Sequence, residues 1–279
     1  MSQTASLALL GTAFLAYLQG TVLYQLLLAS RRPRFGHWAT ISLLVGVAAQ
    51  SLALLARWLA GGRLTLEGSV DTLAVYAWLT AGAYLALERA IREKALGALV
   101  APLISLAVLA AILLPREAHP ELVPFIRSVW LPVHIVVSVV GYSSLTVAFG
   151  SAVLYLLHER QLKGSRGHLL RLPPLGTLEL ITYRLVEVGF IALTLTLISG
   201  AIGSEQVWGS YWTWEPKQTA TLVTWLVYAL YFHLRNVAGW SGRQTARCAV
   251  VGFVAVLITY LVMNLFLPGQ HNFGFSMVL

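Results

Sequence analysis

Two histidines and a stretch rich in tryptophan are the residues of this chain best suited to carry chemistry. The stretch Trp208–Lys217 holds three tryptophans and a tyrosine within seven residues, and a glycine and a proline interrupt it. His134 stands near the start of one apolar run, and His271 follows the last such run. Two imidazoles beside flat aromatic side chains favour bis-imidazole ligation of a planar macrocycle. Haem fits, because its iron takes two axial nitrogens while the porphyrin faces need apolar contact.

The same region offers cations for the carboxylates of such a ligand. Haem propionates pair with basic side chains, which Arg127, Arg63 and Lys217 are placed to supply. Two other readings stay open. Trp and Tyr gather at every membrane interface, so the stretch is also typical of an anchoring belt. A transporter of another amphipathic ligand is the second alternative, although most of the apolar runs have no ionisable residue near their middle, where a transport relay would need one.

Composition indicates which elements position these residues. Of 279 residues 58% are hydrophobic and 11% are charged, whereas soluble domains average about 25% charged residues. The apolar residues gather in runs long enough to span a bilayer, and in lipid such runs become helices because each must satisfy its own backbone polar groups. Few runs alternate with period two, which argues against a membrane barrel. The single cysteine, Cys248, excludes an internal disulfide and a CxxC redox pair.

We therefore predict an all-α integral membrane protein, a bundle of about eight transmembrane helices. Residues 1–6 contain no basic segment, so we expect the first run to be a retained helix and not a signal peptide. The predicted spans cover residues 5–29, 38–60, 72–88, 95–114, 130–157, 182–203, 219–235 and 248–267.

The net charge of +8 lies in the loops between these spans, which is a topogenic pattern and not the sign of a nucleic-acid partner. Fourteen of the nineteen basic residues fall on one side, which the positive-inside rule makes cytoplasmic. Both termini and the Trp-rich stretch are then expected outside the cytoplasmic membrane of a bacterium, level with His134 and His271. The fourteen are Arg31, Arg32, Arg34, Arg89, Arg92, Lys94, Arg160, Lys163, Arg166, Arg171, Arg184, Arg235, Arg243 and Arg247.

Three segments together resemble a known family. The run Trp208-Gly-Ser-Tyr-Trp-Thr-Trp-Glu-Pro-Lys-Gln218, followed by Thr224 to Arg235, looks like the "WWD" signature of haem-handling proteins. The segment Leu131-Pro-Val-His134 and the ending Asn264 to Gly274, with its histidine, are similar to the histidine segments of the CcsA (ResC) family. That family belongs to system II of cytochrome c biogenesis. The resemblance covers roughly residues 129–274, and the first four spans match only in number and hydropathy.

The resemblance implies a function and a set of residues. The CcsA family works with a CcsB (ResB) partner in a cytochrome c synthase complex, carries haem b across the membrane and presents it to apocytochrome c. There the two thiols of a CxxCH motif add to the haem vinyl groups. Carried over by position, His134 and His271 ligate an external haem, and His233 ligates haem at an inner site with a second ligand from the partner. The same transfer places the loop residues and one arginine at the external haem: Trp208, Gly209, Tyr211, Trp212, Trp214, Glu215, Lys217 and Arg127.

The implied organisation has two parts, an N-terminal four-helix membrane part at 1–115 and a haem-handling core at 116–279 with its external Trp-rich loop at 204–218. Two residues depart from the family pattern, since Glu215 replaces the usual Asp and Gln218 replaces the usual Glu. Pro216 is still expected to begin the seventh helix, since proline suits the first helical position. Because Glu is a poor helix cap, a contact made by the usual acid is expected to be rearranged here. No residue of this chain is predicted to act as a general base or nucleophile, so its role is positional.

Two alternatives stand beside this function. A haem-delivery relay of the CcmC type has a similar loop and no attachment activity, but six spans are expected of it. A non-catalytic regulatory protein of the CcsA type shares the fold and tends to lack the intact loop.

Overall fold

The structure, a computed structural model, describes residues 3–30, 32–61, 69–114, 130–164 and 172–262. Within these ranges the chain forms eight α-helices and one short π-helix, with no strand. They are α1 (Gln3–Ser30), α2 (Pro33–Gly61), α3 (Ser69–Ile91), α4 (Gly97–Leu113), α6 (Trp130–Lys163), α7 (Leu175–Trp208), α8 (Pro216–Asn236), α9 (Arg243–Leu257) and η2 (Ile258–Val262).

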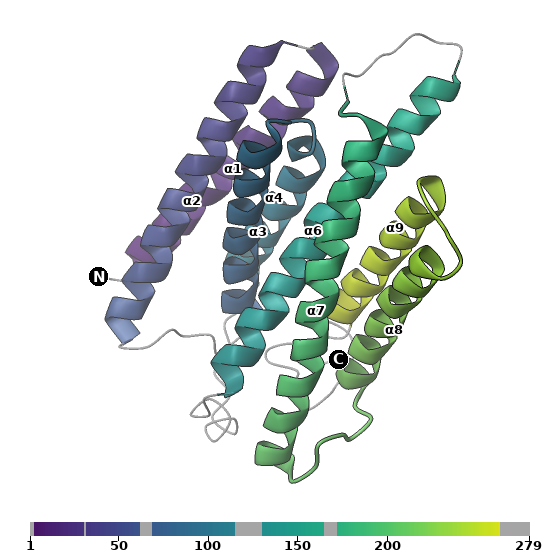
Figure 1. The fold of residues 1–279 in the computed structure, drawn as a ribbon. Coiled ribbons are helices and arrows are strands. Elements are labelled where there is room, and N and C mark those ends of the chain that lie inside the picture. Colours follow the sequence, from purple (N-terminus) through teal and green to yellow (C-terminus); the bar gives the residue numbers. More distant parts are fainter. Residues whose placement is uncertain (1–2, 31, 62–68, 115–129, 165–171, 263–279) are drawn as a thin grey trace.

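The helices stand side by side as one bundle (Figure 1). Neighbours in sequence pair as antiparallel hairpins, α1 with α2, α6 with α7 and α8 with α9. Helix α6 also packs against α3 and α9, so it joins the first four helices to the last three. Each of the eight predicted spans corresponds to one helix, which confirms the predicted fold class.

Four helices, α1, α2, α6 and α7, are long and apolar enough to cross a membrane. Helices α6 and α7 have 34 residues each, which is about 51 Å of helix against a hydrocarbon core of roughly 30 Å. Both must therefore project beyond the lipid or tilt. For α7 the predicted bounds 182–203 were too short at both ends, because the polar residues beyond them also continue the helix. Together these helices make the chain a multi-pass membrane protein.

Small residues set how α6 and α7 meet. A Cβ on Gly141 would lie 3.3 Å from the Cβ of Ala192, and one on Gly189 would overlap the side chain of Leu145. In membranes such small residues let two helix backbones approach closely. This contact fixes the register in which the N-terminal half of α6 faces α7.

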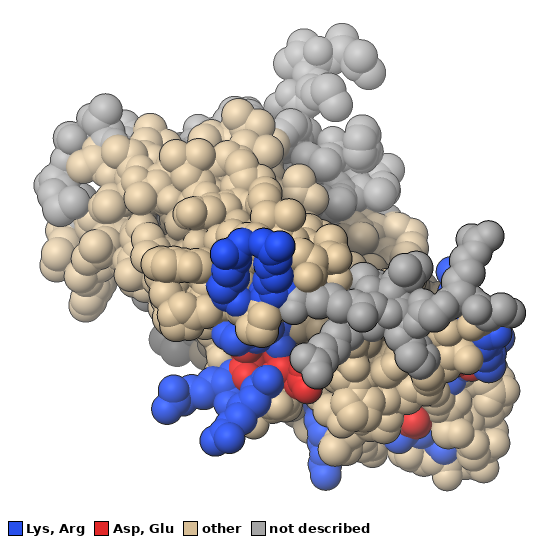
Figure 2. Space-filling view, turned by 90° about the horizontal axis from the view of Figure 1, so that it is seen from above, with Lys and Arg blue, Asp and Glu red and all other residues tan. Residues whose placement is uncertain are grey.

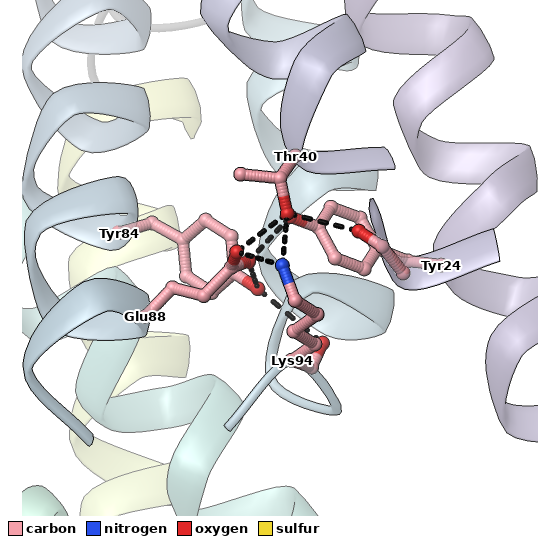
Figure 3. A network of polar contacts seen from close by, with 6 residues as sticks. Tyr24, Thr40, Tyr84, Glu88 and Lys94 are labelled. Carbon is pink, nitrogen blue, oxygen red and sulfur yellow. Dashed lines mark hydrogen bonds and ion pairs between the residues drawn. The ribbon is translucent and has the colours of Figure 1, made fainter. Parts of the chain in front are cut away.

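A buried polar cluster ties the first three helices together at the upper end of the bundle (Figure 3). The Glu88 carboxylate of α3 accepts hydrogen bonds from Tyr24 at 2.5 Å, Tyr84 at 2.7 Å and Thr40 at 2.6 Å. Lys94 Nζ lies 2.7 Å from the same carboxylate and also donates to Thr40 Oγ1. Only 4% of Glu88 is exposed, so this buried charge is both hydrogen-bonded and paired.

Basic residues of the described ranges gather at this same upper end (Figure 2, seen from above). Figure 2 shows Lys and Arg side chains around a few acidic ones. At the lower end lie Arg57, which pairs with Asp71 at 2.5 Å, and Lys217. The upper end is therefore the one that the positive-inside rule predicts to be cytoplasmic.

Candidate functional site

The Trp-rich stretch forms a short connection at the lower end of α7 and α8 (Figure 1). Trp208 is the last residue of α7, so residues 204–208 of the expected loop 204–218 continue that helix. The helix ends at Gly209, whose φ of 69° is left-handed and whose N–H donates to Glu205 O at 2.8 Å. A glycine adopts this conformation without strain, which makes it the residue that ends α7. Helix α8 then begins at Pro216, as the proline predicted.

The aromatic side chains of this loop divide into exposed and partly buried ones. Trp214 is 70% exposed and Tyr211 is 62% exposed. Trp212 is partly buried and stands edge-on to Trp214, with ring centroids 5.7 Å apart and planes at 86°. Its Nε1 is buried with no hydrogen-bond partner among the described residues. Trp214 and Tyr211 thus offer the faces that a planar ligand could reach, with Trp212 behind them.

Glu215 and Lys217 lie where the loop turns into α8. Glu215 is the N-cap residue, is buried, and makes no side-chain capping bond, which confirms the prediction of a poor cap. Lys217 is partly buried, and this burial lowers its pKa to about 8, while the nearby Glu215 carboxylate opposes the shift. A cation of this kind gains from an anion such as a propionate, which would restore its charged form.

His134 lies one turn into α6 and faces α7. Its Nδ1 is 3.2 Å from Thr196 O and 3.2 Å from Ser199 Oγ. Thr196 O is a carbonyl and can only accept, and the Ser199 hydroxyl is directed at two backbone carbonyls, Leu195 O at 2.7 Å and Thr196 O at 3.3 Å. The tautomer that satisfies these contacts has the ring proton on Nδ1, which puts the lone pair on Nε2. In this tautomer a histidine can bind a metal ion while its other nitrogen is held in place.

Three residues of α7 that hold this histidine escaped the sequence analysis. Thr196 and Ser199 supply the acceptors, and Gly200 makes room for the ring, because a Cβ there would lie 3.0 Å from His134 Cε1. The signal that could have found them is a patch of small and hydroxyl residues on one helix face, at spacings of three and four. Such patches are also common in ordinary helix packing, so the signal becomes specific only once the register is known.

The start of the Trp-rich stretch does not lie level with His134. Gly200, beside His134, precedes Trp208 by about two helical turns, or roughly 12 Å along α7. Figure 1 shows that α7 extends below the first turn of α6 and that the loop then rises again to the start of α8. The end of α7 therefore lies beyond His134, whereas the start of α8 returns towards its level. His271, Arg127 and Arg63 lie outside the described residues.

His233 stands at the opposite end of α8, about 25 Å along the helix from Pro216. Two residues on, Arg235 is held against α7 by Glu179 Oε1 at 2.9 Å and by the Tyr183 ring, whose centroid is 4.5 Å from the guanidinium carbon. Residues two apart on a helix point to nearly opposite sides. His233 is accordingly exposed on the face of α8 that points away from α7.

Residues 66–271 match the family model described as cytochrome C assembly protein. Two proteins called cytochrome c biogenesis protein CcsA are 36% and 34% identical to this chain, from Chlamydomonas reinhardtii over 230 residues and from Prochlorococcus marinus strain MIT 9303 over 269 residues. This chain belongs to the cytochrome c assembly protein family. The predicted resemblance to CcsA proteins is thereby confirmed.

The matches within this family differ in length. The alignment covers 80% of this chain and 65% of the Chlamydomonas protein, so the chain spans about two thirds of that relative's length. For the Prochlorococcus protein the shares are 85% and 84%. The fold also resembles the solved structure of a cytochrome c heme lyase, CcmF, with a TM-score of 0.66 over 93% of this chain and 47% of that one. At 20% identity this likeness shows a shared fold only.

Proposed function

We propose that this chain binds haem b at the lower end of α6, α7 and α8 and presents it to apocytochrome c. The two thiols of a CxxCH motif would then add across the haem vinyl groups, so that each S–H becomes a thioether and a C–H bond. The observation that carries this proposal is the placement of His134 at the lower end of α6, where its Nδ1 lies 3.2 Å from Thr196 O and 3.2 Å from Ser199 Oγ on α7. Membership of the cytochrome c assembly family supports the same function.

The part of this chain in the reaction is positional. His134 and His271 would hold the iron from its two sides, while Trp214 and Tyr211 offer exposed rings to the porphyrin. Lys217 would pair with a propionate. The incoming CxxCH histidine replaces one axial ligand as the thioethers form. Whether the chain itself counts as an enzyme depends on its CcsB-type (ResB-type) partner, with which we place it in a synthase complex.

A second, inner haem site at His233 forms part of this proposal. Glu179 and Tyr183 hold Arg235 to α7, and this turns the exposed His233 towards the surroundings of the bundle. A histidine so placed can share an iron with a ligand from another protein. We infer that the CcsB-type partner supplies this ligand, and that haem enters from the cytoplasmic end and leaves at the outer face.

The test is the absorption spectrum of the purified chain with its partner. His134→Ala and His271→Ala should each lose the bis-histidine spectrum of the outer haem, and imidazole added to the buffer should restore part of it. His37→Ala is the matched control, because His37 is an exposed histidine at the upper end of α2. An unchanged haem spectrum in both site variants would refute the ligand assignment.

Two measurements separate this function from its alternatives. His233→Ala should lower total haem loading while leaving the outer ligands intact, and normal loading would refute the inner site. Covalent haem on a co-expressed CxxCH peptide separates a synthase from a relay of the CcmC type. A chain that never binds haem would favour a regulatory protein or a transporter of another ligand.

A further inference from the structure

The side chain of Gln218 joins three segments of the outer loop. Its Oε1 accepts from Thr213 N at 3.0 Å and from Thr213 Oγ1 at 3.1 Å. Its Nε2 donates to Ser204 Oγ at 3.3 Å. Ser204 belongs to the last turns of α7, Thr213 to the loop, and Gln218 to the first turn of α8. We call these three residues the Gln218 clasp.

The clasp needs an amide at position 218. Ser204 Oγ donates its one hydrogen to Ser210 O at 2.7 Å, so it can only accept from Gln218. A glutamate could still accept from Thr213, but an ionised carboxylate has no hydrogen to donate to Ser204. Either two oxygens would then face each other, or Ser204 would turn and release Ser210 O. Each outcome loses one hydrogen bond of the clasp.

The residue beside the clasp has a strained backbone. Trp214 has a φ of 56°, in the left-handed region that residues with a side chain rarely adopt. Such a residue persists only where its neighbours hold it. The residue before it, Thr213, is bound by Gln218, and the Thr219 hydroxyl is shared between Glu215 O at 3.0 Å and Trp214 O at 3.3 Å. Adjacent residues in the first turn of α8 therefore hold the backbone on both sides of Trp214.

We propose that Gln218 is a positioning residue that keeps the Trp214 indole turned outwards, where 70% of the residue is exposed. With the clasp broken, Trp214 relaxes towards negative φ and its ring turns away from the ligand face. Gln218 holds Trp214 in this orientation whether or not a ligand is bound. Only the effect on haem binding rests on the proposed function. It also gives a physical role to the glutamine that departs from the family pattern.

The loop itself is tested without haem. The protein is labelled with 5-fluorotryptophan, and the Trp214 resonance in the 19F spectrum is identified by its loss in Trp214→Phe. Gln218→Glu and Ser204→Ala should each shift or split this resonance, while that of Trp38, at the far end of the bundle, stays in place. Gln244→Glu makes the same chemical change on an exposed residue of α9 and should move neither signal. An unchanged Trp214 resonance in both clasp variants would overturn the proposal.

Haem titration of the same variants tests the consequence for the ligand. Gln218→Glu should keep the bis-histidine spectrum and raise the haem dissociation constant roughly threefold to tenfold, the range expected for loss of one aromatic contact. A moved resonance with unchanged affinity would overturn the role of Gln218 towards haem. If the unaltered protein binds no haem, the proposed function fails, and the 19F spectrum still decides whether the clasp exists.

Discussion

The two ends of the bundle use polar groups in opposite ways. At the upper end the buried Glu88 carboxylate accepts hydrogen bonds from Tyr24, Tyr84 and Thr40 and pairs with Lys94. At the lower end the aromatic loop has a strained tryptophan, exposed rings and a buried indole nitrogen without a hydrogen-bond partner among the described residues. The upper cluster is complete without a ligand, whereas the loop leaves strain and contact area that a ligand could use. The difference indicates that the first is built for stability and the second for binding.

The largest expected effect belongs to the upper cluster. Glu88→Ala removes the shared acceptor of two buried tyrosine hydroxyls and the ionic partner of the partly exposed Lys94, and each buried polar group left unsatisfied costs about 1–3 kcal/mol. We expect a much lower midpoint of thermal unfolding in detergent. The control is Glu187→Ala, since Glu187 pairs with Arg184 at an exposed site, where a pair contributes about 0–1 kcal/mol. Equal unfolding midpoints for the two variants would show that the Glu88 cluster contributes no more to stability than an exposed ion pair.

A smaller effect, on binding instead of folding, is expected at Trp214. Trp214→Ala and Trp214→Gly both remove the exposed indole, so each should weaken haem binding by about 1 kcal/mol. They differ in backbone strain, because only glycine adopts a φ of 56° at no steric cost. We expect the glycine variant to be the more stable by roughly 0.5–1 kcal/mol. Haem titration of the two variants measures the loss of the indole contact, and thermal unfolding measures the backbone strain. Equal stability would show that the backbone at Trp214 carries no strain.

Much of the fold and part of the site follow from local sequence. Apolar runs predicted every described helix, and Pro216 predicted where α8 begins. A local pattern also predicted that Glu215 caps poorly. These succeed because each depends on residues within a turn or two along the chain.

What the sequence left open depends on contacts between helices. The Nδ1 partners of His134 lie more than sixty residues away on α7, and the Gln218 clasp spans the end of one helix and the start of the next. The first depends on the register set where Gly141 and Gly189 let α6 and α7 approach, and the second on how α8 returns beside α7. No periodicity within one segment specifies that register. The offset between His134 and Trp208 could not be predicted either, because it depends on the true length of α7.

The smallest expected effect is the pH dependence of haem affinity that Lys217 confers on the lower end of the bundle. Burial lowers the pKa of Lys217 to about 8, so at neutral pH the amine is charged and can pair with a propionate. As the pH rises through that value the amine loses its proton, and haem affinity should fall by roughly 0.5–1 kcal/mol, the usual contribution of a partly exposed pair. Lys217→Arg keeps its charge to far higher pH and should flatten the profile between pH 7 and 9.5.

This pH profile is read from haem titrations at several pH values, with Lys163→Arg as the control. Lys163 is exposed at the upper end, where it pairs with Glu159 at 2.5 Å, so its replacement should leave the profile of the unaltered protein in place. A falling affinity that persists in Lys217→Arg would assign the titration to another group and remove Lys217 from the site. A flat profile in that variant alone would show that Lys217 takes its anionic partner from the ligand. The Glu88 carboxylate at the other end of the bundle, in contrast, is already paired with Lys94.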